Sequence, residues 1–247
     1  KMKSPAPEWP LPRVVAHRCG GSLAPENTLA GLPITAALGF GAVEFDVMLS
    51  ADNTPWLIHD ETLERTSNGK GLVSATPDSV LQSLDAGAYY HRSFVGEPLP
   101  RFEAVARRCQ QLGLQANVEI KPATGFEAIT GEIVAQHILQ LWQGLPLPLI
   151  SSFSEVALAA ARRVSERLPL GYLCDEPPAD WPERLAAVQG YSLHCSSKVS
   201  DADLARARAL EVPVLCWTIN DRALAESLLK RGVNSVICDR IDRMRGL

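Results

Sequence analysis

Two short segments of the sequence place acidic side chains at every second position, between apolar ones. In Val43-Glu44-Phe45-Asp46-Val47 the two carboxylates alternate with three apolar residues. Successive residues of a β-strand point to opposite faces, so Glu44 and Asp46 should share one face and the apolar residues the other. In Asn117-Val118-Glu119-Ile120-Lys121 the same alternation puts Asn117, Glu119 and Lys121 on one face. The apolar faces suit packing against helices, which would turn the polar faces inward.

Three carboxylates, Glu44, Asp46 and Glu119, would then converge in one place. Carboxylates are seldom buried unless they are paired or coordinate a cation. An all-oxygen cluster favours a hard divalent cation, Mg²⁺ or Ca²⁺, over Zn²⁺. On spacing alone, interstrand salt bridges in which Arg18 and Lys121 neutralise the acids remain the alternative.

Two histidines lie where predicted strands end. His17 closes the first strand, and His59 closes a short hairpin strand over Pro55–His59. Arg18 offers a planar fork for phosphate oxygens, and the backbone amides around Gly20 and Gly21 offer further donors. Two histidines beside a phosphorus centre could supply a general base and a general acid, although a single histidine at such a position is more often structural.

The elements that must position these residues alternate between strands and helices. Helices are expected at 28–38, 101–111, 155–167, 201–210 and 222–231. Eight strands are expected at 13–17, 42–49, 115–121, 147–153, 170–174, 191–195, 212–219 and 235–239. Eight such units in about 250 residues predict an α/β fold, a closed (β/α)8 TIM barrel of parallel strands. A doubly wound open sheet is the rival, but no G-x-G-x-x-G motif follows the first strand.

The chain should form one domain over residues 1–247, with residues 1–12 as an extended N-terminal arm. A hairpin excursion after the second strand, over residues 50–100, interrupts the alternation, and long loops at barrel strand ends are often functional. Four of the six cysteines, at positions 174, 195, 216 and 238, are 21, 21 and 22 residues apart. That spacing is typical of a repeating structural unit and not of a disulfide framework.

The composition excludes several classes of protein. The formal net charge is −4, so binding to nucleic acid is not expected, because that function needs a basic face. No run of 18 apolar residues occurs, so no membrane insertion is expected. With no signal peptide and no metal-type cysteine spacing, a cytoplasmic location with reduced thiols is predicted.

Several motifs, in order along the chain, resemble those of one family. They are His17-Arg18-Cys19-Gly20-Gly21-Ser22-Leu23-Ala24-Pro25-Glu26-Asn27-Thr28, the segment 43–47, His59-Asp60, 63–69, Glu119-Ile120-Lys121-Pro122, Ser151-Ser152-Phe153 and Trp217-Thr218-Ile219-Asn220. Together they resemble the glycerophosphodiester phosphodiesterases, in their cytosolic bacterial form.

The resemblance implies roles for particular residues. His17 and His59 would be the catalytic acid–base pair, and Glu44, Asp46 and Glu119 would hold one divalent cation. Arg18 and Lys121 would contact the phosphate, and Trp217 would form an aromatic wall for the substrate. The family usually has glycine where this chain has Cys19, so Cys19 would be strained if the backbone there needs a positive φ.

The activity implied is metal-dependent hydrolysis of a small-molecule glycerophosphodiester to sn-glycerol 3-phosphate and an alcohol. The alternatives are a lysophospholipase D-like relative, a metal-dependent sugar isomerase barrel, and a barrel that binds phosphodiesters without catalysis.

Other polar residues have a structural interpretation. His194 is expected to be a satisfied structural histidine, with a place in the pocket lining as the alternative. Asn27 is expected to cap the first helix, and Asp60 either orients a neighbour or ends the hairpin. Tyr89 and Tyr90 are expected to pack, although the excursion could fold over the site.

Overall fold

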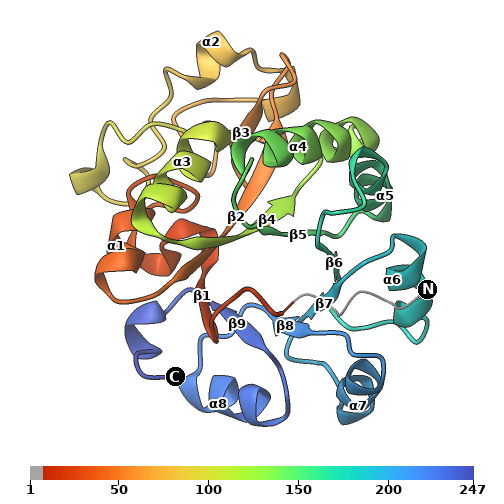
Figure 1. Cartoon of the computed structure of the whole chain (residues 1–247). Helices are drawn as coiled ribbons and strands as arrows, with labels where there is room; N and C mark the ends of the chain where they lie inside the picture. The colour runs from red at the N-terminus through yellow and green to blue at the C-terminus, as the bar shows by residue number, and fades with distance from the viewer. Residues whose placement is uncertain (1–7) are drawn as a thin grey trace.

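A computed structural model describes residues 8–247, and within them eight parallel strands close into a barrel (Figure 1). Each barrel strand pairs with the next, and β1 pairs with both β9 and β2, which closes the ring. The predicted (β/α)8 barrel is confirmed. The barrel strands are β1 (Val14–Ala16), β2 (Ala42–Leu49), β4 (Gln115–Ile120), β5 (Leu149–Ser152), β6 (Leu170–Leu173), β7 (Ser192–Cys195), β8 (Val214–Cys216) and β9 (Ser235–Cys238).

Helices follow the strands and surround the barrel, as Figure 1 shows. Side chains cap the first turns of some of these helices. Ser200 and Asp203 form a reciprocal capping box at the start of α7 (Asp201–Ala209), and Asp221 caps the start of α8 (Arg222–Lys230). A short 3-10 turn, Ile241–Arg243, follows β9 in place of a longer helix. The helices are α1 (Gly31–Ala37), α3 (Phe102–Leu112), α4 (Glu127–Leu141), α5 (Glu155–Val164), α6 (Trp181–Ala187), α7 (Asp201–Ala209) and α8 (Arg222–Lys230).

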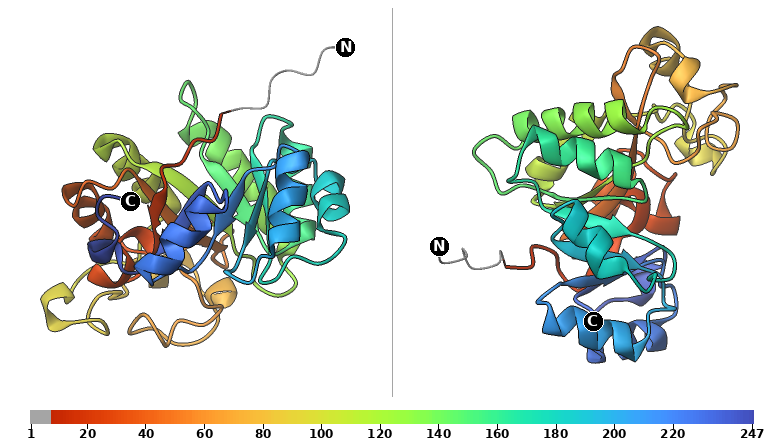
Figure 2. Two further views of the ribbon diagram at one scale, coloured as in Figure 1. Left: turned by 90° about the horizontal axis from the view of Figure 1, so that it is seen from below. Right: turned by 90° about the vertical axis from the view of Figure 1, so that its right-hand side faces the viewer.

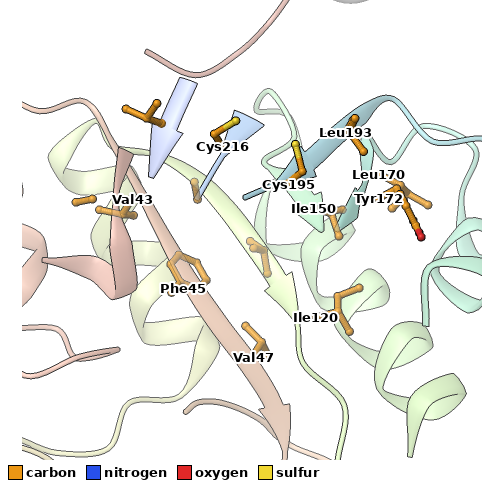
Figure 3. Close-up of a cluster of buried hydrophobic side chains, with 14 of the residues drawn as sticks. Val43, Phe45, Val47, Ile120, Ile150, Leu170, Tyr172, Leu193, Cys195 and Cys216 are labelled. Carbon is orange, nitrogen blue, oxygen red and sulfur yellow. The ribbon is translucent and has the colours of Figure 1, made fainter. Parts of the chain in front are cut away.

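The apolar faces of the strands pack outward against this helix ring. Val43, Phe45 and Val47 of β2 lie in the main buried cluster (Figure 3), and Phe45 meets Phe102 of α3 with ring centroids 5.9 Å apart. Cys195, Cys216 and Cys238 end three consecutive strands in this cluster. The cysteine spacing therefore reflects the repeating unit. All six cysteines are buried and unbridged.

The barrel interior has an apolar plug at its amino-terminal end. Val15, Ala42, Leu149, Leu215 and Ile237 form it, and Leu11 is buried with them. Trp9 packs against the plug and donates a hydrogen bond from Nε1 to Ser235 Oγ at 2.8 Å. The expected arm falls partly outside the described residues, and its described part, residues 8–12, covers this end of the barrel.

The excursion after β2 forms the expected hairpin. Strand β3 (Pro55–Leu57) pairs antiparallel with β2, and the short helix α2 (Asp78–Leu81) follows. Trp56, Leu63, Val73 and Leu81 belong to a small separate core. Figure 2 shows the orange-to-yellow segment extending from the end of the barrel opposite to the one where the chain enters at residue 8. None of the helices in residues 8–247 has the length and apolarity needed to cross a bilayer.

Candidate active site

A pocket lies at the carboxyl ends of the barrel strands, where barrel enzymes assemble their sites. The structure brings all the predicted site residues to the lining of this one pocket: His17, Arg18, Glu44, Asp46, His59, Glu119, Lys121 and Trp217. These residues are far apart in the sequence. The closed barrel brings them together, because the ends of different strands line the same pocket.

The three carboxylates form the acidic centre of the pocket. Asp46 and Glu119 are register partners on β2 and β4, and Glu44 lies two residues before Asp46 on the same face. One oxygen from each of the three lies within 4.8 Å of the others. Glu44 and Asp46 are only 2% and 1% exposed. The predicted convergence of the carboxylates inside the barrel mouth is confirmed.

Protein groups balance this buried charge only in part. Burial, together with Asp46 and Glu119, raises the pKa of Glu44 well above its usual range. Burial and the nearby Asp46 raise the pKa of Glu119 to about 8. Glu44 Oε1 has no hydrogen-bond partner.

A bound divalent cation fits these observations better than salt bridges do. The ligand atoms are all oxygen, which suits Mg²⁺ or Ca²⁺. Among residues 8–247 the only basic side chain within ion-pair distance of these carboxylates, apart from His17, is Arg18, whose Nε lies 3.6 Å from Asp46 Oδ2. Lys121 lines the pocket without such a contact.

The loop after β1 holds Asp46 through Asn27. Asn27 Nδ2 donates to Asp46 Oδ2 at 2.9 Å, and the backbone N–H of Asp46 donates to Asn27 Oδ1 at 3.1 Å. Asn27 has a φ of 56°, in the left-handed region that asparagine tolerates. The prediction that Asn27 caps the first helix is wrong, since α1 begins only at Gly31 and its N-cap residue is Ala30.

The segment Arg18-Cys19 turns sharply beside the carboxylates. Arg18 and Cys19 have φ values of 48° and 78°, and the turn lets the Arg18 backbone N–H donate to Glu44 Oε2 at 3.1 Å. Position 19 therefore does need a positive φ, and Cys19 is strained there. Burial raises the pKa of the Cys19 thiol well above its ordinary value, so the thiol stays protonated and is unsuited to act as a nucleophile.

His17 is oriented by a carboxylate that the sequence did not reveal. Its Nδ1 lies 2.7 Å from Asp239 Oδ1, and its Nε2 lies 3.8 Å from Glu44 Oε2. Asn220 holds Asp239 in turn, donating from Nδ2 to Asp239 Oδ2 at 3.0 Å. Because a carboxylate only accepts, Nδ1 carries the proton, which leaves Nε2 of neutral His17 unprotonated.

His59 has a similar partner, from the adjacent residue. Its Nδ1 lies 2.8 Å from Asp60 Oδ1. Arg65 donates to both Asp60 oxygens, at 2.7 and 3.0 Å, and to both Glu26 oxygens, at 2.9 and 2.8 Å. Glu26 also accepts from Arg18 at 2.9 Å. The hydrogen bonds from Arg65 lower the pKa of Asp60, and burial lowers that of His59.

Aromatic side chains complete the pocket and its surroundings. Phe153 and Trp217 meet edge to face, with centroids 5.6 Å apart. Tyr89 and Tyr90 of the excursion hydrogen-bond to the loop after β1, through the Glu26 N–H and the Ser22 carbonyl. His194 lines the pocket, and Ser192 Oγ lies 2.9 Å from its Nε2 while its Nδ1 has no partner, so the expectation of a satisfied structural histidine holds for only one of the two ring nitrogens.

The strand ends of this barrel bring together three carboxylates, two histidines that are each held by a carboxylate, and two basic side chains. This combination identifies the protein as a (β/α)8-barrel enzyme. The model of the glycerophosphoryl diester phosphodiesterase family matches residues 17–243, and the chain belongs to this hydrolase family.

Individual relatives agree with this assignment. The chain is 29% identical over 235 residues to a glycerophosphodiester phosphodiesterase of Caldanaerobacter subterraneus subsp. tengcongensis, covering 92% of this chain and 93% of the relative. A solved Oleispira antarctica phosphodiesterase, in complex with the product sn-glycerol-3-phosphate, is 36% identical with a TM-score of 0.89. That match covers 95% of this chain and 96% of the other. A glycerophosphodiester phosphodiesterase structure from Agrobacterium tumefaciens, 24% identical, shares the fold with a TM-score of 0.79, over 96% of this chain and all of that one (100%).

Proposed function

We propose that this protein hydrolyses glycerophosphodiesters to sn-glycerol 3-phosphate and an alcohol, with a divalent cation and histidine acid–base catalysis. The observation that carries the proposal is the meeting of His17, His59 and the three carboxylates in one pocket. The product named for the Oleispira antarctica structure supports the same substrate class.

Glu44, Asp46 and Glu119 would hold the cation, Mg²⁺ or Ca²⁺. When bound, the cation supplies Lewis-acid neutralisation of charge on the phosphoryl oxygens. Arg18 and Lys121 would bind the same oxygens, Arg18 through its planar fork. Glu26 and Asp46 hold the Arg18 guanidinium beside the carboxylates, at 2.9 and 3.6 Å.

His17 and His59 would move the protons. Each donates its Nδ1–H to a carboxylate, so each has Nε2 available to take or deliver a proton. One would deprotonate the nucleophile, either water or the glycerol 2-hydroxyl, and the other would protonate the departing alcohol oxygen. Asp239 and Asp60 would stabilise the imidazolium form, which the general base becomes when it takes its proton and from which the general acid delivers its proton.

Two of the alternatives, the sugar isomerase and the non-catalytic barrel, lack support of this kind. A sugar isomerase would need metal ligands from further strands, and the carboxylate cluster of residues 8–247 comes from β2 and β4 alone. A purely binding barrel would have no need of two histidines that are each oriented by a carboxylate.

The proposed partner is a small-molecule glycerophosphodiester, with neither nucleic acid nor membrane insertion involved. We also propose a cytoplasmic location, which the six buried, unbridged cysteines support.

Product analysis tests the function directly. Glycerophosphocholine incubated with the protein and Mg²⁺ should yield choline and sn-glycerol 3-phosphate in equal amounts. Release of phosphocholine and glycerol would show that the other ester bond is cleaved, and no release with Mg²⁺ or Ca²⁺ would refute the proposal.

A further inference from the structure

Beside the carboxylate cluster the pocket has further polar side chains that the proposed chemistry does not use. Asn117 and Ser151 line the pocket from β4 and β5, and His194 lines it from β7. Asn117 lies two residues before Glu119 on the same face of β4 and is the register partner of Glu44, and Ser151 is the register partner of Glu119. Of the apolar plug, Leu149 is the register partner of Asn117, and Ile237 lines the same pocket. We call Asn117, Ser151 and His194 the polar floor.

The fold makes room for His194 in this floor. The strand register places Gly171 of β6 between Ser151 of β5 and Ser192 of β7. A Cβ atom at Gly171 would lie 2.5 Å from His194 Nε2, so the imidazole fills the space that a side chain would occupy. Ser192 Oγ lies 2.9 Å from Nε2 and holds the ring.

Two polar atoms of the floor are left without partners. Asn117 Nδ2 donates to Ser151 Oγ at 3.2 Å, but Asn117 Oδ1 accepts nothing. His194 Nδ1 also lacks a partner. Asn117 is 1% exposed and His194 is fully buried. An unpaired buried polar atom costs about 1 to 3 kcal/mol, so the pocket gains stability when a ligand supplies the missing hydrogen bonds.

The chemistry of these atoms selects the ligand group. The acceptor Asn117 Oδ1 and the neighbouring carboxylates disfavour an anion, so the phosphate belongs higher, with Arg18 and Lys121. Burial lowers the pKa of His194 to about 3, so its imidazole is neutral. A hydroxyl both donates and accepts, and therefore satisfies Asn117 Oδ1 and either tautomer of His194.

We propose that the polar floor binds the free hydroxyls of the glycerol moiety through Asn117 Oδ1 and His194 Nδ1. Leu173, Ile237 and Trp217 line the same pocket and would pack against the glycerol carbons. This inference rests on the proposed function and names the residues that would select glycerol over other alcohols. Trp217 Nε1, which is also buried and unpaired, could donate to the same hydroxyls.

Two phosphate monoesters with the same three-carbon skeleton test the proposal. sn-Glycerol 3-phosphate carries two free hydroxyls, and n-propyl phosphate carries none. Their dissociation constants should be measured by calorimetry on the Mg²⁺-loaded protein. We expect the wild type to bind sn-glycerol 3-phosphate at least about tenfold more tightly.

Variants at position 194 test whether His194 causes this difference between the two dissociation constants. His194→Leu should reduce the ratio of the two dissociation constants to below about threefold, whereas His194→Asn, which keeps a polar atom near the Nδ1 position, should retain part of it. His137→Leu is the matched control, since His137 lies on α4 and, among residues 8–247, hydrogen-bonds through its side chain only to the Ile133 carbonyl.

The outcomes separate this inference from the function on which it rests. Equal binding of the two monoesters by the wild type would overturn the polar floor, and this result needs no variant. An unchanged ratio of the two dissociation constants in His194→Leu would also overturn it and would show that these polar groups bind only water. Release of choline from glycerophosphocholine by the wild type would still support the proposed function in either case.

Discussion

Nδ1 of His17 lies 2.7 Å from Oδ1 of Asp239, across the seam where the first and last barrel strands pair. The two residues are 222 positions apart in the sequence. Burial alone would raise the pKa of Asp239, but the hydrogen bond from His17 holds it below its ordinary value. Asp239 therefore remains ionised, which fixes the tautomer of His17.

Asp239→Asn should lower kcat by about 10²-fold or more. Asn220 Nδ2 donates to Oδ2 of Asp239, so the new amide would turn its oxygen toward Asn220 and its NH₂ toward His17. His17 would then carry its proton on Nε2, the wrong nitrogen. Steady-state kinetics on glycerophosphocholine check this, with Asp201→Asn, an exposed ion-pair residue, as the control. Wild-type kcat in Asp239→Asn would contradict the role.

Arg65→Met should lower kcat about tenfold with little change in KM. Arg65 joins Asp60, the partner of His59, to Glu26, the partner of Arg18. Without its hydrogen bonds the pKa of Asp60 should rise toward normal, so the acidic limb of the pH–kcat profile should move to higher pH. Arg107→Met, which breaks a surface ion pair with Glu103, should leave kcat and the pH–kcat profile unchanged. A loss of activity with an unmoved profile would indicate a merely structural role.

Metal-free protein should become less stable as the pH rises from about 5 to about 8. The raised pKa values of Glu44 and Glu119 mean that the folded state binds more protons than the unfolded state in this range. The stabilisation is therefore complete below the ordinary carboxyl pKa and is lost as the pH rises through the folded-state values. A divalent cation replaces those protons, so the rise in Tm on adding Mg²⁺ or Ca²⁺ should be larger near pH 8.

Tm measured by thermal unfolding in chelator and in excess Mg²⁺, at about pH 5 and at about pH 8, tests this loss of stability. Glu119→Gln removes one of the raised groups, so its Tm in chelator should depend less on pH. A metal-free Tm that increases with pH would contradict the account, as would full activity in excess chelator.

Much of the site follows from local alternation in the sequence. The period of two in segments 43–47 and 117–121 places Glu44, Asp46 and Glu119 inside the barrel, and the structure agrees. Asp239 could not be found locally, because its contact with His17 exists only once the barrel closes. One signal was available: in a closed barrel, the residue after the last strand lies beside the residue after the first.

Other contacts depend on loop conformation, which alternation does not encode. Asn27 reaches Asp46 because its backbone has a positive φ and the first helix begins later than expected, at Gly31. Arg65 meets both Glu26 and Asp60 only because the excursion folds back onto the loop after β1. The orientation of His194 depends on the absence of a side chain at Gly171, on the neighbouring strand.

Glycerophosphocholine and glycerophosphoethanolamine should have kcat/KM values within about tenfold of each other, or about 1.4 kcal/mol. The residues of the polar floor are buried, whereas Phe153, which packs on Trp217, is half exposed. The head group should therefore extend toward solvent and make few contacts. A much larger preference would show an enclosed head-group site.

The central claim is that His17 and His59 are the catalytic acid–base pair. Whether the reaction needs the general acid depends on the leaving group. Choline and p-nitrophenol esters of sn-glycerol 3-phosphate differ in this respect, because p-nitrophenolate departs without a proton. His17→Ala and His59→Ala should each lower kcat on glycerophosphocholine by about 10² to 10⁴-fold, with the bound metal retained.

The most direct measurement is therefore kcat for both variants on both esters, with metal content determined on the same samples. We expect the variant lacking the general acid to recover most of its activity on the p-nitrophenyl ester, and the variant lacking the base to remain slow. Near wild-type kcat on glycerophosphocholine in either variant would contradict the claim that the pair is catalytic.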